Sequence, residues 1–282
     1  MKKTAAQEED LLPIGTSVIR DIEYKNASGT KLMMNIYSCK SSGKPLPLVM
    51  YMHGGGWANG NRTSCHRAVF LLEYGFTLAS IDYRLTDAAT FPAQLEDCKA
   101  AVRFLRANRE KYNLDTEKIG VCGHSAGGHL ASLLGTTGEN SEFDRGDNLD
   151  FSSDVQAVCN FYGPGSIPCL IKSARLTGAN DIVQVAEKLI GGPLEEKKGI
   201  AEKASPLNYI HRNAAPFLII HGDNDASVEV SVSKSFHKAL LEAGVESHLH
   251  IITGGRHGGE EFLLPEIVKK TISFLDKHIR QR

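Results

Sequence analysis

The residues best suited to covalent chemistry surround Ser125. The stretch Gly123-His124-Ser125-Ala126-Gly127 follows an apolar run and precedes a helical pattern over residues 128–134. A serine between glycines at such a strand-to-helix turn projects its hydroxyl outward, as a nucleophile requires. A serine hydroxyl attacks poorly at neutral pH, so this chemistry also needs a base and a group that orients the base.

One histidine and two aspartates downstream meet these needs. An apolar run is followed by Asp223 and Asp225, and the next run is followed by His257 in a loop with four glycines. A histidine on such a loop is free to reach the serine, and either carboxylate could orient its imidazole. The residues therefore predict Ser125 as nucleophile and His257 as base, and they leave the acid open between Asp223 and Asp225.

Three consecutive glycines indicate where the charge of such a reaction would be stabilised. They stand in His53-Gly54-Gly55-Gly56-Trp57, directly after the apolar run 48–52. Each glycine costs backbone entropy on folding, so a bare backbone here indicates a close approach to another group. Attack on an acyl carbonyl turns its oxygen into an anion, which backbone N–H groups stabilise. The pattern predicts such donors from Gly55 and Gly56, with a third from Ala126 beside the nucleophile.

The elements that would position these residues are short apolar runs separated by helical stretches. Residues 17–24 and 31–38 alternate apolar and polar positions around Asn26-Ala-Ser-Gly29, which predicts an antiparallel hairpin. The later strands are predicted at 48–52, 76–81, 119–122, 155–161, 217–220 and 248–252. Such runs between helices are typical of a parallel sheet covered on both faces. We therefore expect an α/β fold with a mostly parallel central sheet, an N-terminal antiparallel hairpin and helices on both faces.

One segment departs from this rhythm. Residues 163–212 contain four prolines and one short amphipathic stretch, 182–190, between two predicted strands. Ligands of open α/β folds bind at the carboxyl ends of the strands. We therefore expect residues 1–282 to form a single domain in which 163–212 is a small lid-like insertion over those ends.

Composition and charge argue against several classes of partner. Lys and Arg total 32 against 33 Asp and Glu, a formal net charge of -1, and no run of five like charges occurs, so neither nucleic acid nor a membrane surface is an expected partner. No apolar run approaches the length that spans a bilayer. The six cysteines form no CxxC pair, and the motifs imply neither a metal nor another cofactor. Met1-Lys2-Lys3 is basic, but polar residues follow where a signal peptide would be apolar.

Four motifs together resemble one superfamily. In order and spacing, HGGGW at 53–57, GHSAGG at 123–128, HGDND at 221–225 and GGRHGG at 254–259 resemble the α/β-hydrolase superfamily, particularly its hormone-sensitive-lipase-like esterase branch. The resemblance covers nearly the whole chain. It implies the α/β-hydrolase fold and a serine hydrolase of carboxylic esters that works through an acyl-enzyme.

The resemblance also assigns roles residue by residue. It places the nucleophile on Ser125 and the base on His257, and its acid stands three residues after the glycine of an HGxxDxxV pattern, which selects Asp225 over Asp223. The oxyanion donors implied are Gly55, Gly56 and Ala126, with the N–H of Trp57 used by some members. Arg84, in the stretch Ile81-Asp-Tyr-Arg-Leu85, is implied as a brace for the HGGG loop.

Two departures from the branch point to a subgroup. Thr86-Asp-Ala-Ala-Thr-Phe-Pro-Ala93 replaces the usual Ala-Pro-Glu, and a hairpin replaces a large helical N-terminal cap. This variant looks most like the bacterial carbohydrate esterases that release acetyl or feruloyl groups from plant xylan. It implies a small-molecule or polysaccharide ester substrate, an acyl or sugar pocket lined by Trp57 and Tyr162, and a secreted or periplasmic location if a leader was removed upstream, otherwise a cytoplasmic one.

Two alternatives stay open on the sequence. A kynurenine-formamidase-like amidase would share an HGG-x-W loop and the same three catalytic residues. A catalytically silent ligand-binding relative would be expected to lose the serine or the histidine, and both are present at 125 and 257. The oligomeric state is not indicated by any pattern in the chain.

Overall fold

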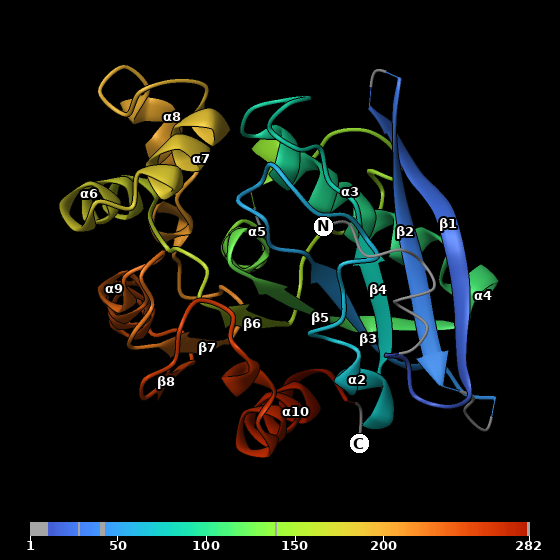
Figure 1. Cartoon of the computed structure of the whole chain (residues 1–282). Helices are drawn as coiled ribbons and strands as arrows, with labels where there is room; N and C mark the ends of the chain where they lie inside the picture. The colour runs from blue at the N-terminus through green and yellow to red at the C-terminus, as the bar shows by residue number, and fades with distance from the viewer. Residues whose placement is uncertain (1–10, 28, 40–42, 139, 281–282) are drawn as a thin grey trace.

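A single sheet organises the computed structural model, which describes residues 11–27, 29–39, 43–138 and 140–280. Its eight strands lie in the order β1-β2-β4-β3-β5-β6-β7-β8 (Figure 1). β1 pairs with β2 and β2 with β4 in antiparallel fashion, and the other neighbours are parallel. The strands are β1 Thr16–Ala27, β2 Thr30–Cys39, β3 Leu46–Met52, β4 Thr77–Ile81, β5 Leu114–His124, β6 Ala157–Phe161, β7 Phe217–Gly222 and β8 Ser247–Ile252.

This topology confirms the predicted α/β-hydrolase-type sheet with its N-terminal hairpin. Every predicted strand is present, but β5 begins at Leu114 rather than at residue 119. Its first residues pair with the start of β3, Leu46 opposite Leu114, before a register shift. Asp115, Glu117 and Lys118 make this part of the strand polar, so apolar content alone does not reveal it.

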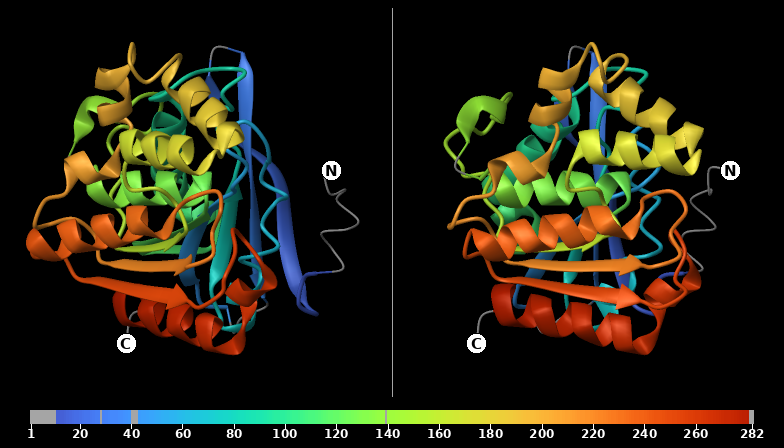
Figure 2. Two further views of the ribbon diagram at one scale, coloured as in Figure 1. Left: turned by 60° about the vertical axis from the view of Figure 1, so that its left-hand side comes forward. Right: turned by 90° about the vertical axis from the view of Figure 1, so that its left-hand side faces the viewer.

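Helices cover both faces of the sheet, as predicted. Figure 2 shows α10 on one face, with α5 and α9 on the other. The longer helices of the two faces are α3 Ala93–Ala107, α5 Ala126–Thr136, α9 Val230–Glu242 and α10 Pro265–Ile279, and the shorter ones are α2 Phe70–Glu73 and α4 Arg109–Tyr112. Short 3-10 turns lie at Ser141–Phe143, Pro206–Tyr209 and Glu260–Leu263. α3 follows Pro92 directly and α10 begins at Pro265, since proline is tolerated at the start of a helix.

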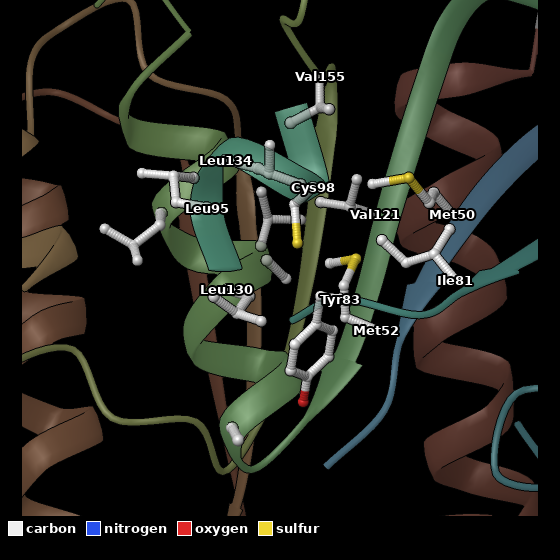
Figure 3. Packing of buried hydrophobic residues seen from close by; sticks show 14 of the residues in the cluster. Met50, Met52, Ile81, Tyr83, Leu95, Cys98, Val121, Leu130, Leu134 and Val155 are labelled. Carbon is white, nitrogen blue, oxygen red and sulfur yellow. The ribbon is translucent and has the colours of Figure 1, made fainter. Parts of the chain in front are cut away.

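Two apolar clusters fix these layers, one on each side of the sheet. β3 contributes Met50 and Met52 to one cluster and Val49 and Tyr51 to the other, because successive side chains of a strand point to opposite faces. Figure 3 shows the first cluster, where side chains of β3 and β5 meet α3 and α5. This burial holds the carboxyl ends of the strands in fixed positions, which is what a site built at those ends requires.

Residues 163–212 fold mainly into three helices, α6 Ile167–Thr177, α7 Asn180–Ile190 and α8 Lys198–Lys203. Figure 1 shows them grouped at one end of the molecule. The C-terminal part of α7 is tied to the segment after β4, because the Phe91 N–H donates to the Leu189 carbonyl at 2.8 Å. In the described part of the chain, no helix combines the length and the apolar character needed to cross a membrane.

Candidate active site

Ser125 stands at a sharp turn between β5 and α5. Its backbone has φ 55° and ψ −119°, a conformation that costs a non-glycine residue free energy and is found at functional sites. Two glycines make the turn possible: a Cβ on Gly123 would lie 2.2 Å from the Gly127 carbonyl oxygen, and one on Gly127 would lie 2.0 Å from that of Met52. Neighbouring backbone therefore leaves no room for a side chain at either glycine.

The structure brings Ser125, His257 and Asp225 together. His257 Nε2 lies 2.9 Å from Ser125 Oγ, and His257 Nδ1 lies 2.7 Å from Asp225 Oδ2. Because an ionised carboxylate only accepts hydrogen bonds, Nδ1–H donates to Asp225 and Nε2 is left to accept from the serine hydroxyl. This is the arrangement in which a histidine can remove the proton of an attacking serine.

Asp225 is held as an anion by the backbone around it. Its Oδ1 accepts from the N–H groups of Ser227 at 2.8 Å and Val228 at 2.9 Å, and the His221 ring nitrogen lies 3.2 Å from Oδ2. Burial alone would raise the pKa of this carboxyl. The hydrogen bonds from His221, His257 and Val228 outweigh burial and hold the pKa of Asp225 well below its usual value. A carboxylate that stays charged can keep the imidazole in one tautomer.

Asp223, the other candidate acid, bonds the backbone of the turn after β8 and not the imidazole. It is exposed, and its Oδ1 accepts from the Gly254 N–H at 2.6 Å. This bond joins the turns after β7 and β8. The structure therefore places Asp225, and not Asp223, against the imidazole.

The HGGGW loop runs beside the nucleophile with three successive residues in left-handed conformations. Gly55, Gly56 and Trp57 have φ values of 115°, 60° and 57°. In the described chain, the N–H groups of these three residues donate to no protein acceptor. Ala126 is the first residue of α5, where N–H groups lack a partner within the helix. The four predicted donors, Gly55, Gly56, Trp57 and Ala126, thus have N–H groups without a protein acceptor, and their role in binding an oxyanion stays a prediction.

The support of this loop differs from the expectation for Arg84. Arg84 does not brace the loop: its guanidinium bonds Asp97 of α3 at 2.8 Å, because that buried carboxylate lies beside it. Arg62 takes part in holding the segment, since its N–H and its guanidinium bond the two oxygens of Asp82 at 2.7 and 2.8 Å. The Thr86 N–H adds a bond to the Trp57 carbonyl at 2.9 Å.

The indole of Trp57 packs away from the cleft, in contrast to the pocket-lining role expected for it. It is 3% exposed, and its Nε1–H donates to His129 Nδ1 at 3.2 Å. His129 Nε2–H in turn donates to the Ala204 carbonyl at 2.6 Å, and burial lowers the pKa of His129 to about 4, so the ring remains neutral near pH 7. Trp57 therefore links the loop to α5 and to the segment that follows α8.

A cleft of about 470 Å³ opens above Ser125 and His257. Tyr162 lines it and sets its ring edge-on to His257, with ring centroids 4.6 Å apart, and its contact with substrate stays a prediction. α7 supplies one wall through Asp181, Ile182 and Val185. Val185 lies against the loop, because a Cβ on Gly56 would be 3.3 Å from its side chain. Ser64 and Arg67, from the segment after the loop, also line the cleft.

The family of this chain follows from a comparison with family models. The BD-FAE model matches residues 34–240, more than half of the chain. The chain belongs to the BD-FAE family. The matched range includes the HGGGW loop, Ser125 and Asp225, and it ends before His257.

Known relatives and solved structures agree with this. The chain is 31% identical over 199 residues to Esterase LipC of Mycobacterium tuberculosis. The matched region covers 70% of this chain and 49% of LipC. The chain spans about half the length of LipC and of two further curated esterases of the same organism that it matches. A bifunctional GH43-CE protein of Bacteroides eggerthii superposes with a TM-score of 0.81 at 33% identity, over 92% of this chain and 35% of that one.

A second solved structure is matched over almost the whole of its chain. The acetyl ester-xyloside bifunctional hydrolase of Caldicellulosiruptor lactoaceticus superposes with a TM-score of 0.76 at 26% identity, over 95% of this chain and 97% of that one. These likenesses confirm the predicted α/β-hydrolase fold and the predicted resemblance to carbohydrate esterases of that superfamily.

Several residues of the cleft have no counterpart in the sequence predictions. Ile182 and Val185 lie on the predicted amphipathic stretch 182–190, and Asp181 directly precedes it, but the pattern does not say which residues meet the cleft. Ser64 and Arg67 belong to a loop whose sequence shows no helical or strand pattern. No local signal there indicates that a residue contacts a segment far away in the sequence.

Proposed function

We propose that this chain is a serine esterase that hydrolyses carboxylic esters of small acyl groups, acetyl or feruloyl groups on plant xylan, through an acyl-enzyme. The observation that carries the proposal is the chain of contacts from Ser125 Oγ through His257 to Asp225, at 2.9 and 2.7 Å, beside unpaired backbone donors. The relatives named above support the ester as the class of bond, and the carbohydrate esterases among them support the sugar.

The geometry supports the following sequence of steps. Ser125 Oγ attacks the ester carbonyl carbon while its proton passes to His257 Nε2, and the carbonyl oxygen becomes an anion bound by N–H groups from Gly55, Gly56 or Trp57 and from Ala126. The bond to the alcohol oxygen then breaks, and that oxygen leaves with the proton from His257. Water attacks the acyl-serine, gives its proton to His257 and releases the acid, and the proton returns to Ser125 Oγ.

The walls of the cleft suit a small acyl group on a sugar. Ile182 and Val185 offer an apolar wall against the oxyanion loop, which limits the room there. Asp181 and Ser64 add polar groups able to bond sugar hydroxyls. We further propose that 163–212 acts as a small lid within a single domain, since α7 forms one wall and leaves the cleft open to a bulky alcohol.

A substrate panel tests the proposal. We expect turnover of p-nitrophenyl acetate and release of acetate from acetylated xylan, with weaker turnover of long-chain esters because α7 closes one side of the cleft. Methyl ferulate tests the feruloyl group, and N-formylkynurenine tests an amide instead of an ester. The proposal fails if the formamide is preferred to every ester, or if no ester is hydrolysed while a small molecule binds tightly.

Val185 should set the acyl size that the enzyme accepts. Because its side chain lies against Gly56, Val185→Ala removes bulk beside the proposed oxyanion site. We expect the ratio of kcat/KM for p-nitrophenyl butyrate to that for the acetate to rise about 10-fold. Val183→Ala is the matched control, since Val183 is on the same helix and packs against the core without lining the cleft. Equal ratios in both variants would remove Val185 from the acyl site.

A further inference from the structure

Arg67 reaches from the oxyanion side of the site to the loop that carries His257. It lies in the segment between the HGGGW loop and α2, and its guanidinium contacts two successive carbonyls after the histidine. Nη1–H donates to the Gly259 carbonyl at 3.1 Å, and Nη2–H donates to the Gly258 carbonyl. One planar side chain thus joins two parts of the site that lie 191 and 192 residues apart in the sequence.

Little else holds those two carbonyls. In the described chain, the other hydrogen bond to them comes from the Phe262 N–H, which lies 3.4 Å from the Gly259 oxygen, near the limit for such a bond. No carboxylate of the described residues forms an ion pair with Arg67. Its guanidinium is therefore directed at the backbone of the loop, where a charged donor makes a stronger hydrogen bond than a neutral one.

Gly258 shows how closely the loop is enclosed. It has φ 74°, and a Cβ placed on it would lie 2.8 Å from Tyr162 Oη and 3.5 Å from Arg67 Nη2. The phenol of Tyr162 and the guanidinium of Arg67 therefore both lie close to the backbone that follows His257. Tyr162 also contacts the imidazole itself, edge-on. Asp225 thus holds the ring of His257 through Nδ1, and Tyr162 and Arg67 contact the ring or the backbone that follows it.

From this geometry we propose that Arg67 is a positioning residue for His257. By holding the Gly258 and Gly259 carbonyls, it keeps Nε2 within reach of Ser125 Oγ. This matters when His257 takes the proton of Ser125 and when it returns a proton to Ser125. The inference rests on the proposed esterase function. It assigns to Arg67 no contact with the reacting atoms.

The test compares Arg67→Ala with Arg106→Ala on p-nitrophenyl acetate. Arg106 is a matched control, because its guanidinium also donates to two loop carbonyls, those of Ser152 and Asp154, but on α3 away from the cleft. We expect Arg67→Ala to lower kcat and kcat/KM together by on the order of 10- to 100-fold, since a small displacement of a base has that effect. Arg106→Ala should keep kcat and lower only the melting temperature.

Chemical rescue separates positioning from a general loss of structure. Guanidinium chloride at low, non-denaturing concentration should restore part of kcat in Arg67→Ala, with sodium chloride of equal ionic strength as control, and should not change Arg106→Ala. Arg67→Lys should fall between wild type and Arg67→Ala, because one ammonium group does not match two carbonyls as a planar fork does.

Three results would overturn the inference. They are a wild-type kcat in Arg67→Lys, a kcat of Arg67→Ala within about two-fold of wild type, and a loss in Arg67→Ala that tracks its melting temperature and that guanidinium does not reverse. Each presupposes an active wild-type enzyme. A wild-type protein that hydrolyses no ester would instead refute the proposed function, so the two failures are distinguishable.

Discussion

Ser125→Ala and His257→Ala should each reduce ester hydrolysis about 10⁶-fold, because nucleophile and base act as one unit and neither works without the other. Initial rates with p-nitrophenyl acetate measure the loss. Both variants should keep the melting temperature close to that of wild type, since Ser125 lies on the surface of the cleft and His257 on a loop. The double variant should be no slower than either single one.

Two further variants test this prediction. His248→Ala removes an exposed histidine bonded to Glu246, and it should leave kcat unchanged. Ser125→Gly should be as inactive as Ser125→Ala but more stable than it, because glycine adopts the positive φ of this turn without strain. Substantial turnover by a Ser125→Ala protein free of wild-type enzyme would mean that another group attacks the ester.

An independent measurement detects the covalent step. A fluorophosphonate should label wild-type protein at Ser125 alone, and His257→Ala should be labelled far more slowly because its serine keeps its proton. Labelling at another residue, or equal rates in the two proteins, would contradict the assigned pair.

The sequence predicts the site well where each residue follows a buried strand. The HGGGW loop follows β3, Ser125 follows β5, Asp225 follows β7 and His257 follows β8. Parallel pairing brings those ends together: Met52 lies opposite Gly123, and Gly222 lies opposite Ile252. Apolar runs predict such strands, and parallel pairing places their carboxyl ends at the same edge of the sheet. Residues far apart in the chain can therefore be assigned to one cleft.

Side-chain directions outside these strands were not predictable in the same way. Trp57 stands beside the glycines in sequence, yet its indole packs against His129 because φ 57° turns the chain at that point. Arg84 bonds Asp97, a partner that appears only when α3 is in place. The amphipathic stretch of α7 indicates that one face is buried, but a period of 3.6 residues does not identify what that face contacts. Loop conformation and helix docking decide these cases.

Asp225→Asn should lower kcat about 10⁴-fold, whereas Asp223→Asn should stay within about two-fold of wild type. The amide at 225 no longer fixes the tautomer in which Nδ1 carries the proton, so Nε2 is not kept ready to accept the proton of Ser125. Asp223 instead accepts one bond from the Gly254 N–H, and the oxygen of an asparagine can still accept it. Kinetics of the two purified variants on p-nitrophenyl acetate make the comparison.

The same pair of variants should differ in how stability depends on pH. Because the folded-state pKa of Asp225 lies below its unfolded value, its ionised form stabilises the fold above the unfolded pKa, and that stabilisation is lost as pH falls toward the folded pKa. Asp225→Asn should therefore lose less melting temperature than wild type between neutral and acidic pH, while Asp223→Asn should follow wild type. An inactive Asp223→Asn beside an active Asp225→Asn would reverse the assignment of the acid, whatever the melting curves show.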